Sequence, residues 1–169
     1  MDASVALIPQ IHAAASRAGL HPTIEVTRRA GQARDLAAQY AAGGEEVYLY
    51  ACGGDGTLNE ILQGTVGRPN AAIGCVPCGS GNDYVRNFGT QAQFLDLDAQ
   101  LAAQPFAADV IRTPQAAAST SMPRASTPRS PTASPNGGAC LLRRHNGLHA
   151  VDSRGRVQHL QAPSAHHRR

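Results

Sequence analysis

Apolar side chains recur along the first 112 residues with two alternating periods, one typical of helices and the other of strands. In residues 3–19 they return every three or four positions, and Gly19 follows as a natural helix end. Residues 23–27 alternate and are rich in β-branched side chains, which predicts a short strand. By the same reasoning, helices are expected at residues 3–19, 33–42, 58–65, 82–88 and 94–103, and strands at 23–27, 46–51, 72–76 and 107–112.

This alternation predicts an α/β fold, in which a parallel sheet is covered by helices on both faces as a three-layer domain. Ligands of such sheets bind beyond the carboxyl ends of the strands. Two glycine-rich turns, at residues 53–57 and 77–81, follow directly after expected strands. The fold and the unusual turns therefore point to the same edge of the sheet.

The first turn reads Gly53-Gly54-Asp55-Gly56-Thr57 and opens an expected helix. Its glycines let a ligand approach the backbone, and the amides at the start of the helix favour a phosphate. A carboxylate beside a phosphate is repelled unless a cation intervenes, so Asp55 is expected to hold Mg²⁺ or to orient a nucleophile. The alternative is a plain helix entry in which Asp55 serves as a cap.

The second turn supplies a hydroxyl, an amide and a carboxylate one strand further along, from Ser80, Asn82 and Asp83. Together the two turns are expected to form a cleft with phosphate-binding amides and two carboxylates. Phosphoryl transfer from a magnesium nucleotide needs this combination of positioning and charge neutralisation.

Charge divides the chain near Pro114. Residues 1–113 carry seven Arg and eleven acids, for a net charge of −4, whereas residues 114–169 carry eight Arg and one acid, for +7. Every basic residue is Arg. Without Lys, neither a Walker A loop nor a protein-kinase site can be built.

Residues 114–169 differ from the rest in composition, being rich in Pro, Ser, Ala and Arg with few large apolar side chains. Such a segment buries too little surface to offset its ordering entropy, so we expect a disordered tail after a domain of residues 1–113. Its arginines lack interleaved aromatics, which argues against specific nucleic-acid binding. With no signal peptide or membrane span evident, a cytoplasmic protein is expected.

At these motifs the sequence resembles the catalytic domain of diacylglycerol and sphingosine kinases, most of all the bacterial lipid kinases. The resemblance rests on Gly-Gly-Asp-Gly-Thr-Leu-Asn-Glu at residues 53–60, followed about twenty residues later by Pro-x-Gly-Ser-x-Asn-Asp. Val26-Thr27 and Gly31-Gln32-Ala33 also match the family, with Gln where the family has His. The similarity extends over about residues 3–112.

The resemblance implies an ATP- and Mg²⁺-dependent kinase that phosphorylates the hydroxyl of diacylglycerol or a related membrane lipid, working peripherally at the membrane. Asp55 is implied in the metal and catalytic network, with Asp83 and Asp109 as supporting carboxylates. The ATP-binding positions implied are Thr27, Gly53, Gly54, Asp55, Gly56, Thr57, Leu58, Asn59 and Ser80.

Two departures from the family shape what we expect of this chain. The family opens with a strand and an Asn-Pro-x-Ser-Gly turn, and after the position of Asp109 it continues into a β-rich domain covering the lipid. Lacking both, the chain is expected to bind nucleotide weakly, to phosphorylate little lipid, and to self-associate through an exposed sheet edge. Two alternatives stay open: an NAD-kinase-like enzyme, which the placement of Asn59-Glu60 and Asn82-Asp83 disfavours, and an inactive nucleotide-binding fragment.

Cys75 and Cys78 have the spacing of half a zinc or redox site. No second cysteine pair accompanies them, and the motif lies across a strand end, so packing is the better interpretation.

Overall fold

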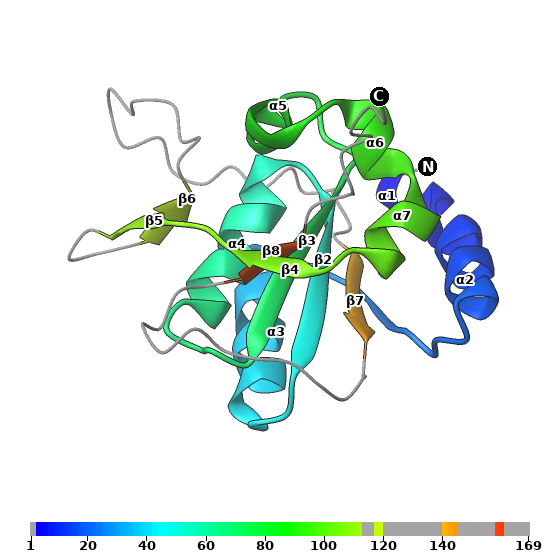
Figure 1. Cartoon of the computed structure of the whole chain (residues 1–169). Helices are drawn as coiled ribbons and strands as arrows, with labels where there is room; N and C mark the ends of the chain where they lie inside the picture. Colours follow the sequence, from blue (N-terminus) through cyan, green and yellow to red (C-terminus); the bar gives the residue numbers. More distant parts are fainter. Residues whose placement is uncertain (1–2, 113–116, 120–139, 145–157, 161–169) are drawn as a thin grey trace, which may run out of the picture.

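The computed structural model describes residues 3–112, 117–119, 140–144 and 158–160, which form a mixed sheet between two layers of helices (Figure 1). The helices are α1 (Ala3–Ala6), α2 (Ile8–Arg17), α3 (Gln32–Ala42), α4 (Asp55–Thr65), α5 (Asp83–Phe88), α6 (Gln91–Leu95) and α7 (Leu97–Ala102). The strands are β1 (Thr23–Val26), β2 (Val47–Gly53), β3 (Ala71–Pro77), β4 (Pro105–Ala107), β5 (Val110–Arg112), β6 (Ala117–Ser119), β7 (Cys140–Arg144) and β8 (Gln158–Leu160).

The main sheet has six strands in the order β1-β7-β2-β3-β8-β4, and β5 pairs separately with β6. The centre is parallel, with β2 beside β3 and β3 beside β8. β1 and β2 are each antiparallel to the intervening β7, so they run in the same direction as one another. The α/β class expected from the sequence is confirmed, and β1, β2 and β3 are parallel as predicted.

The carboxyl ends of these three strands are level with one another. Gly53 at the end of β2 lies opposite Pro77 at the end of β3. Across β7, Val26 and Cys52 share the same partner, Cys140. The loops after β1, β2 and β3 therefore leave the sheet at one edge.

Two apolar clusters hold the layers together. On one face, the buried alanines of α3 and the large side chains of α4 pack against β2 and β3 around Leu49 and Ile73. On the other, α2 and α7 enclose Tyr50, whose hydroxyl donates to the carbonyl of Gln100 at 3.2 Å. Successive residues of β2, Leu49 and Tyr50, point into opposite clusters, as the pleat of a strand requires.

Several expected elements differ at their boundaries. The first expected helix is interrupted at Leu7, the N-cap of α2, and Pro9 follows in the first turn, where its missing N–H is tolerated. The expected helix at 94–103 is divided at Asp96, whose carboxylate accepts from the amide of Ala99 and starts α7. The last expected strand is two short ones, β4 and β5, and β4 runs antiparallel to β8.

Three short strands come from the region expected to be a disordered tail. β7 lies between β1 and β2, and β8 lies between β3 and β4 (Figure 1). Both are therefore interior strands of the sheet. The other residues of that region lie outside the described part of the chain.

Among the described helices, none combines the length and the apolar character needed to cross a bilayer.

Candidate functional site

The candidate site lies at the carboxyl edge of the sheet, where the two glycine turns touch. A side chain on Gly79 would collide with the backbone of Gly54, because a Cβ there would lie 2.6 Å from the Gly54 Cα. The amide of Cys78 also donates to the carbonyl of Gly53 at 2.9 Å. Gly54 and Gly79 therefore have a structural role, because they allow the two backbones to come into contact. Their lack of side chains is needed for this contact whether or not a ligand binds.

Asp55 is the first residue of α4, and its carboxylate bridges the two turns. One oxygen accepts from the amide of Asp83 at 3.0 Å, and the other from the amide of Tyr84 at 3.1 Å. Both amides belong to the first turn of α5. Asp55 does act as a helix cap, but for the neighbouring helix and not for its own.

Among the described residues, no side chain caps the N-terminus of α4. Its N-cap residue is Gly54, which has an extended backbone and no side chain to offer. The first amides of a helix, here those of Asp55, Gly56 and Thr57, have no partner within the helix. Gly56 is exposed, and the space where its Cβ would stand is open. This end of α4 fits a phosphate, because an anion could take the place of the absent cap.

Asn82 adds an unpaired acceptor beside the same turns. It is buried, with a left-handed backbone (φ 54°) that Asn tolerates better than most residues. Its Nδ2 donates to the carbonyl of Gly79 at 2.6 Å, whereas its Oδ1 has no hydrogen-bond partner among the described residues. A buried acceptor of this kind fits a water or a ligand group that donates a hydrogen bond.

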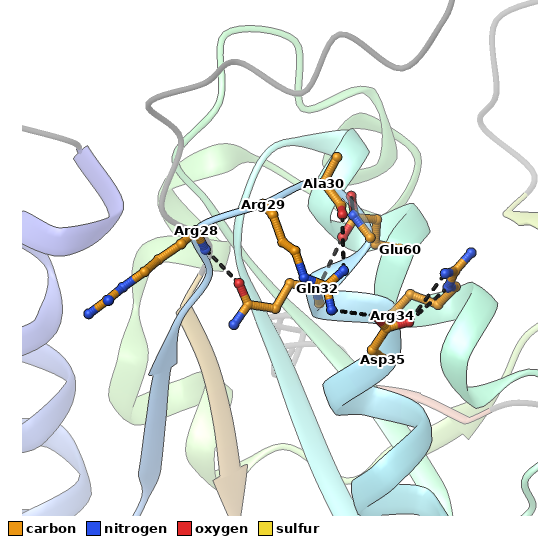
Figure 2. A network of polar contacts seen from close by, with 9 residues as sticks. Arg28, Arg29, Ala30, Gln32, Arg34, Asp35 and Glu60 are labelled. Atoms are coloured by element: carbon orange, nitrogen blue, oxygen red, sulfur yellow. Dashed lines mark hydrogen bonds and ion pairs between the residues drawn. The ribbon is translucent and has the colours of Figure 1, made fainter.

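A third loop, between β1 and α3, is fastened to α4 by Glu60 (Figure 2). One carboxylate oxygen of Glu60 accepts from the amide of Gly31 at 2.8 Å, and the other from the amide of Ala33 at 3.2 Å. Where the loop enters α3, the side chain of Gln32 accepts from the amide of Arg28 at 2.7 Å. The loop that follows Thr27 is thus stabilised by a local bond to Gln32 and by the bonds to Glu60 of α4.

Exposed arginines surround this loop. Asp35 accepts from Arg29 at 2.8 Å and is also paired with Arg34 at 3.2 Å (Figure 2). Hydrogen bonds from Arg29 and then Arg34 lower the pKa of the Asp35 carboxyl group. The loop therefore presents positive charge to solvent at the sheet edge, with part of it neutralised by Asp35.

The other predicted ATP-binding residues differ in their burial and in their hydrogen-bond partners. Thr27 is buried directly after β1, and Asn59 accepts from the side-chain amide of Gln63 at 3.3 Å. Leu58 packs its side chain into the core, and its amide donates to the carbonyl of Gly54 at 3.2 Å, so neither group is available to a ligand. Ser80 is exposed in the second turn.

The two supporting carboxylates are not gathered around Asp55. Asp83 forms an ion pair with Arg86 of its own helix at 2.8 Å. Asp109 is exposed between β4 and β5, and in the described part of the chain no hydrogen bond or ion pair links it to either turn. The structure joins Asp83 to Asp55 through its backbone only.

No cluster of three or more His, Cys, Asp or Glu side chains suited to a metal occurs among the described residues. Mg²⁺ in nucleotide sites commonly has only one or two carboxylate ligands, with phosphate oxygens and water completing the shell. Asp55 alone is compatible with such a shell, since each of its oxygens keeps a lone pair beyond the amide that it accepts.

Beneath Asp55, two ionisable groups are kept neutral. Burial, and to a lesser degree the charges of Asp55 and Cys78, raise the pKa of the Cys75 thiol to about 12. Burial also raises the pKa of the Tyr84 hydroxyl, with a smaller effect of Cys75. Both groups belong to the core below the turns, which agrees with a packing role for Cys75.

Residues 2–113 match the model of the diacylglycerol kinase catalytic domain. The chain belongs to this family. The matched region holds every element that meets at the candidate site, from β1 to α5.

Curated proteins similar to this chain carry the names of diacylglycerol and lipid kinases, in agreement with the family match. The chain is 35% identical over 80 residues to a protein from Staphylococcus saprophyticus named diacylglycerol kinase, covering 47% of this chain and 26% of the relative. It is 37% identical over 78 residues to a probable YegS-like lipid kinase from Pseudomonas aeruginosa, covering 46% and 26%. The chain thus spans about a quarter of the length of these relatives, and no solved structure matches it.

Sequence reasoning missed two contributors to the candidate site, Glu60 and Gly79. Both stand inside the motifs used for the resemblance. The available signal for Glu60 was an acid next to the apolar residues Ile61 and Leu62 on one helix. A half-buried acid in such a position usually has a specific partner.

Proposed function

We propose that this chain binds the phosphates of ATP at the N-terminus of α4, beside the point where the two glycine turns meet. The observation that carries the proposal is the uncapped end of α4 at Gly54, with open space at Gly56. Amides at a helix N-terminus attract phosphate through direct hydrogen bonds and through the helix dipole. Thr57 and Ser80 add hydroxyl groups on the two turns, and Thr27 lies level with them after β1.

Asp55 is proposed to contribute to a Mg²⁺ site while it holds α5 in place. Bound Mg²⁺ would neutralise charge on the phosphates during transfer. The buried Oδ1 of Asn82 is suited to accept a hydrogen bond from a metal-bound water. Asp83 and Asp109 remain proposals as supporting carboxylates, with Asp83 the nearer because its amide contacts Asp55.

The reaction proposed for the whole protein is phosphorylation of a hydroxyl group on diacylglycerol or a related membrane lipid. Membership of the diacylglycerol kinase catalytic family and the names of the relatives support a lipid acceptor. An NAD-kinase-like activity or nucleotide binding without turnover are the outcomes that would replace it.

Calorimetric titration of the full 169-residue chain with Mg-ATP tests the binding step. Saturable binding is expected for the wild type, and weaker binding for Asp55→Asn, because an amide group replaces one of the two acceptors that align the turns. Asp98→Asn is the matched control, since Asp98 pairs with Arg17 on the opposite face of the sheet. Absence of binding by the wild type, or equal loss in the control, would refute the proposal.

A product assay then distinguishes the acceptors. The same chain is incubated with Mg-ATP and either diacylglycerol vesicles or NAD. Phosphorylated lipid supports the lipid kinase, phosphorylated NAD supports the rival enzyme, and binding without either product leaves a nucleotide-binding domain alone.

A further inference from the structure

We propose that Glu60 is a positioning residue of the nucleotide site, which fixes the loop of residues 28–32 against α4. The inference rests on the proposed function, because it concerns the third wall of the same site. It assigns to Glu60 a role through the backbone of the loop and no contact with the nucleotide.

The contacts of Glu60 have the form of a helix cap supplied by another helix. Gly31 is the N-cap residue of α3, and Ala33 is the second residue of that helix. Their amides are among those that a helix leaves without partners, and each donates to a different oxygen of Glu60. A carboxylate is favoured at this position because it also interacts with the positive end of the helix dipole.

Gly31 itself cannot supply the cap. It has no side chain, and its backbone is left-handed at φ 77°, which strongly favours glycine. The loop therefore enters α3 through a conformation that leaves the capping to an outside group. Glu60 is that group, and it reaches across 29 positions of sequence.

Glu60 and Asp55 both cap the N-terminus of a helix next to α4, which is α3 for Glu60 and α5 for Asp55. The two acids are five residues apart, which separates them by about 140° around a helix. Asp55 accepts from the first amides of α5, and Glu60 accepts from the first amides of α3. The helix whose N-terminus is the proposed phosphate site therefore sets the position of both flanking loops.

The loop held by Glu60 joins directly to Thr27, at the level of the glycine turn across the sheet. If Glu60 lost its hold, the loop would lose its two bonds to α4 through this side chain. It would keep local bonds, such as those from the Arg28 amide to Gln32 (Figure 2) and from the Gln32 amide to the carbonyl of Arg29. The loop would then sample more conformations, and binding would have to order it at an entropic cost. We therefore expect weaker nucleotide binding with little change in the rest of the fold.

The experiment compares Glu60→Gln with the wild type in the full chain. Glutamine keeps the shape of glutamate but offers one acceptor oxygen in place of two. Hydrogen exchange at the amides of Gly31 and Ala33, measured by NMR, is expected to accelerate in the variant. Affinity for Mg-ATP is expected to fall about tenfold, a loss typical of removing a supporting partner of a site.

Glu25→Gln is the matched control. Glu25 is also half-buried beside α3, but its carboxylate accepts from the side chain of Tyr40 and not from the loop. The control is expected to keep its exchange rates and its affinity. A structural role alone would lower the melting temperature of Glu60→Gln without a separate loss of affinity.

Unchanged exchange at Gly31 and Ala33 would overturn the inference, and so would unchanged affinity or an equal loss in Glu25→Gln. Amide exchange is measured without nucleotide. It therefore tests the contact even if wild-type chain fails to bind Mg-ATP, an outcome that would refute the proposed function instead.

Discussion

Asp55 and Glu60 are the two acids of the Gly-Gly-Asp-Gly-Thr-Leu-Asn-Glu stretch. In each of them, both carboxylate oxygens accept hydrogen bonds from backbone amides of a neighbouring segment. Hydrogen bonds to charged acceptors are stronger than those between neutral groups, at about 1.5–3 kcal/mol each. One short motif thereby aligns three loops at the sheet edge. Its acids organise the site in addition to any chemistry that they perform.

At the same scale, burial of Cys75 gives a prediction about thiol reactivity. Its pKa of about 12 means that the folded chain keeps the thiol neutral, whereas an unfolded cysteine ionises at about pH 8.5. Between these values only the unfolded state loses the proton, so this group lowers stability as pH rises through that window.

Labelling with iodoacetamide at about pH 8, where an ordinary thiol is partly ionised, checks this expectation. Cys75 is expected to stay unmodified in the folded chain, while the half-buried Cys78 reacts faster. Denaturant should bring the two rates together. Equal rates in the folded chain would show that Cys75 is not protected as described.

Part of the candidate site could be predicted from the sequence. The glycines and Asp55 could be found because they interrupt a strand-to-helix junction with residues that have special backbone or charge properties. Glu60 could not be assigned its role, because its partners lie 27 and 29 positions away and are backbone amides without any sequence signature. The exposed positions of Ser80 and Asp109 likewise depend on how their loops pack.

At the scale of elements, the close packing of α3 on α4 depends on Gly64. A Cβ at Gly64 would collide with the carbonyl oxygen of Arg34 and lie 3.0 Å from the Cβ of Ala37. Three buried alanines of α3 (Ala33, Ala37 and Ala41) form the opposing surface. The two helices thus approach backbone to backbone.

Gly64→Ala is therefore expected to destabilise the fold by about 1–3 kcal/mol, the usual cost of overpacking, although alanine favours helices. Denaturant unfolding measures this change. Gly56→Ala is the control on the same helix, where the space is open and alanine should have no such cost. A Gly64→Ala chain as stable as the wild type would contradict the packing described.

Elements themselves were largely predictable, but their ends were not. The apolar periodicity located the helices that became α3 and α4, yet α4 begins at Asp55 and not at residue 58. Asp55, Gly56 and Thr57 have weak helix propensity, and the contact with α5 compensates for it. The division between α6 and α7 similarly follows from the cap that Asp96 provides.

At the scale of the whole molecule, the sheet contains strands that no local pattern indicated. β7 separates β1 from β2, and β8 separates β3 from β4. A short segment in a polar, arginine- and histidine-rich region carries little intrinsic strand signal, since pairing with neighbours decides the outcome. The order of the sheet could therefore not be read from residues 1–113 alone.

Self-association stays a prediction at this scale. β1 is an edge strand of the described sheet, and Val26 at its end is 38% exposed. Edges of this kind can pair with a second copy.

The central claim is that nucleotide phosphates bind where α4 begins. A titration of isotope-labelled full chain with Mg-ATP, followed by amide NMR, tests it most directly. Saturable shifts are expected at the amides of Asp55, Gly56 and Thr57, with smaller ones after Thr27. Phosphate binding at this position would be contradicted if these amides did not respond, or if the responding amides lay on the opposite face, around α2 and α7.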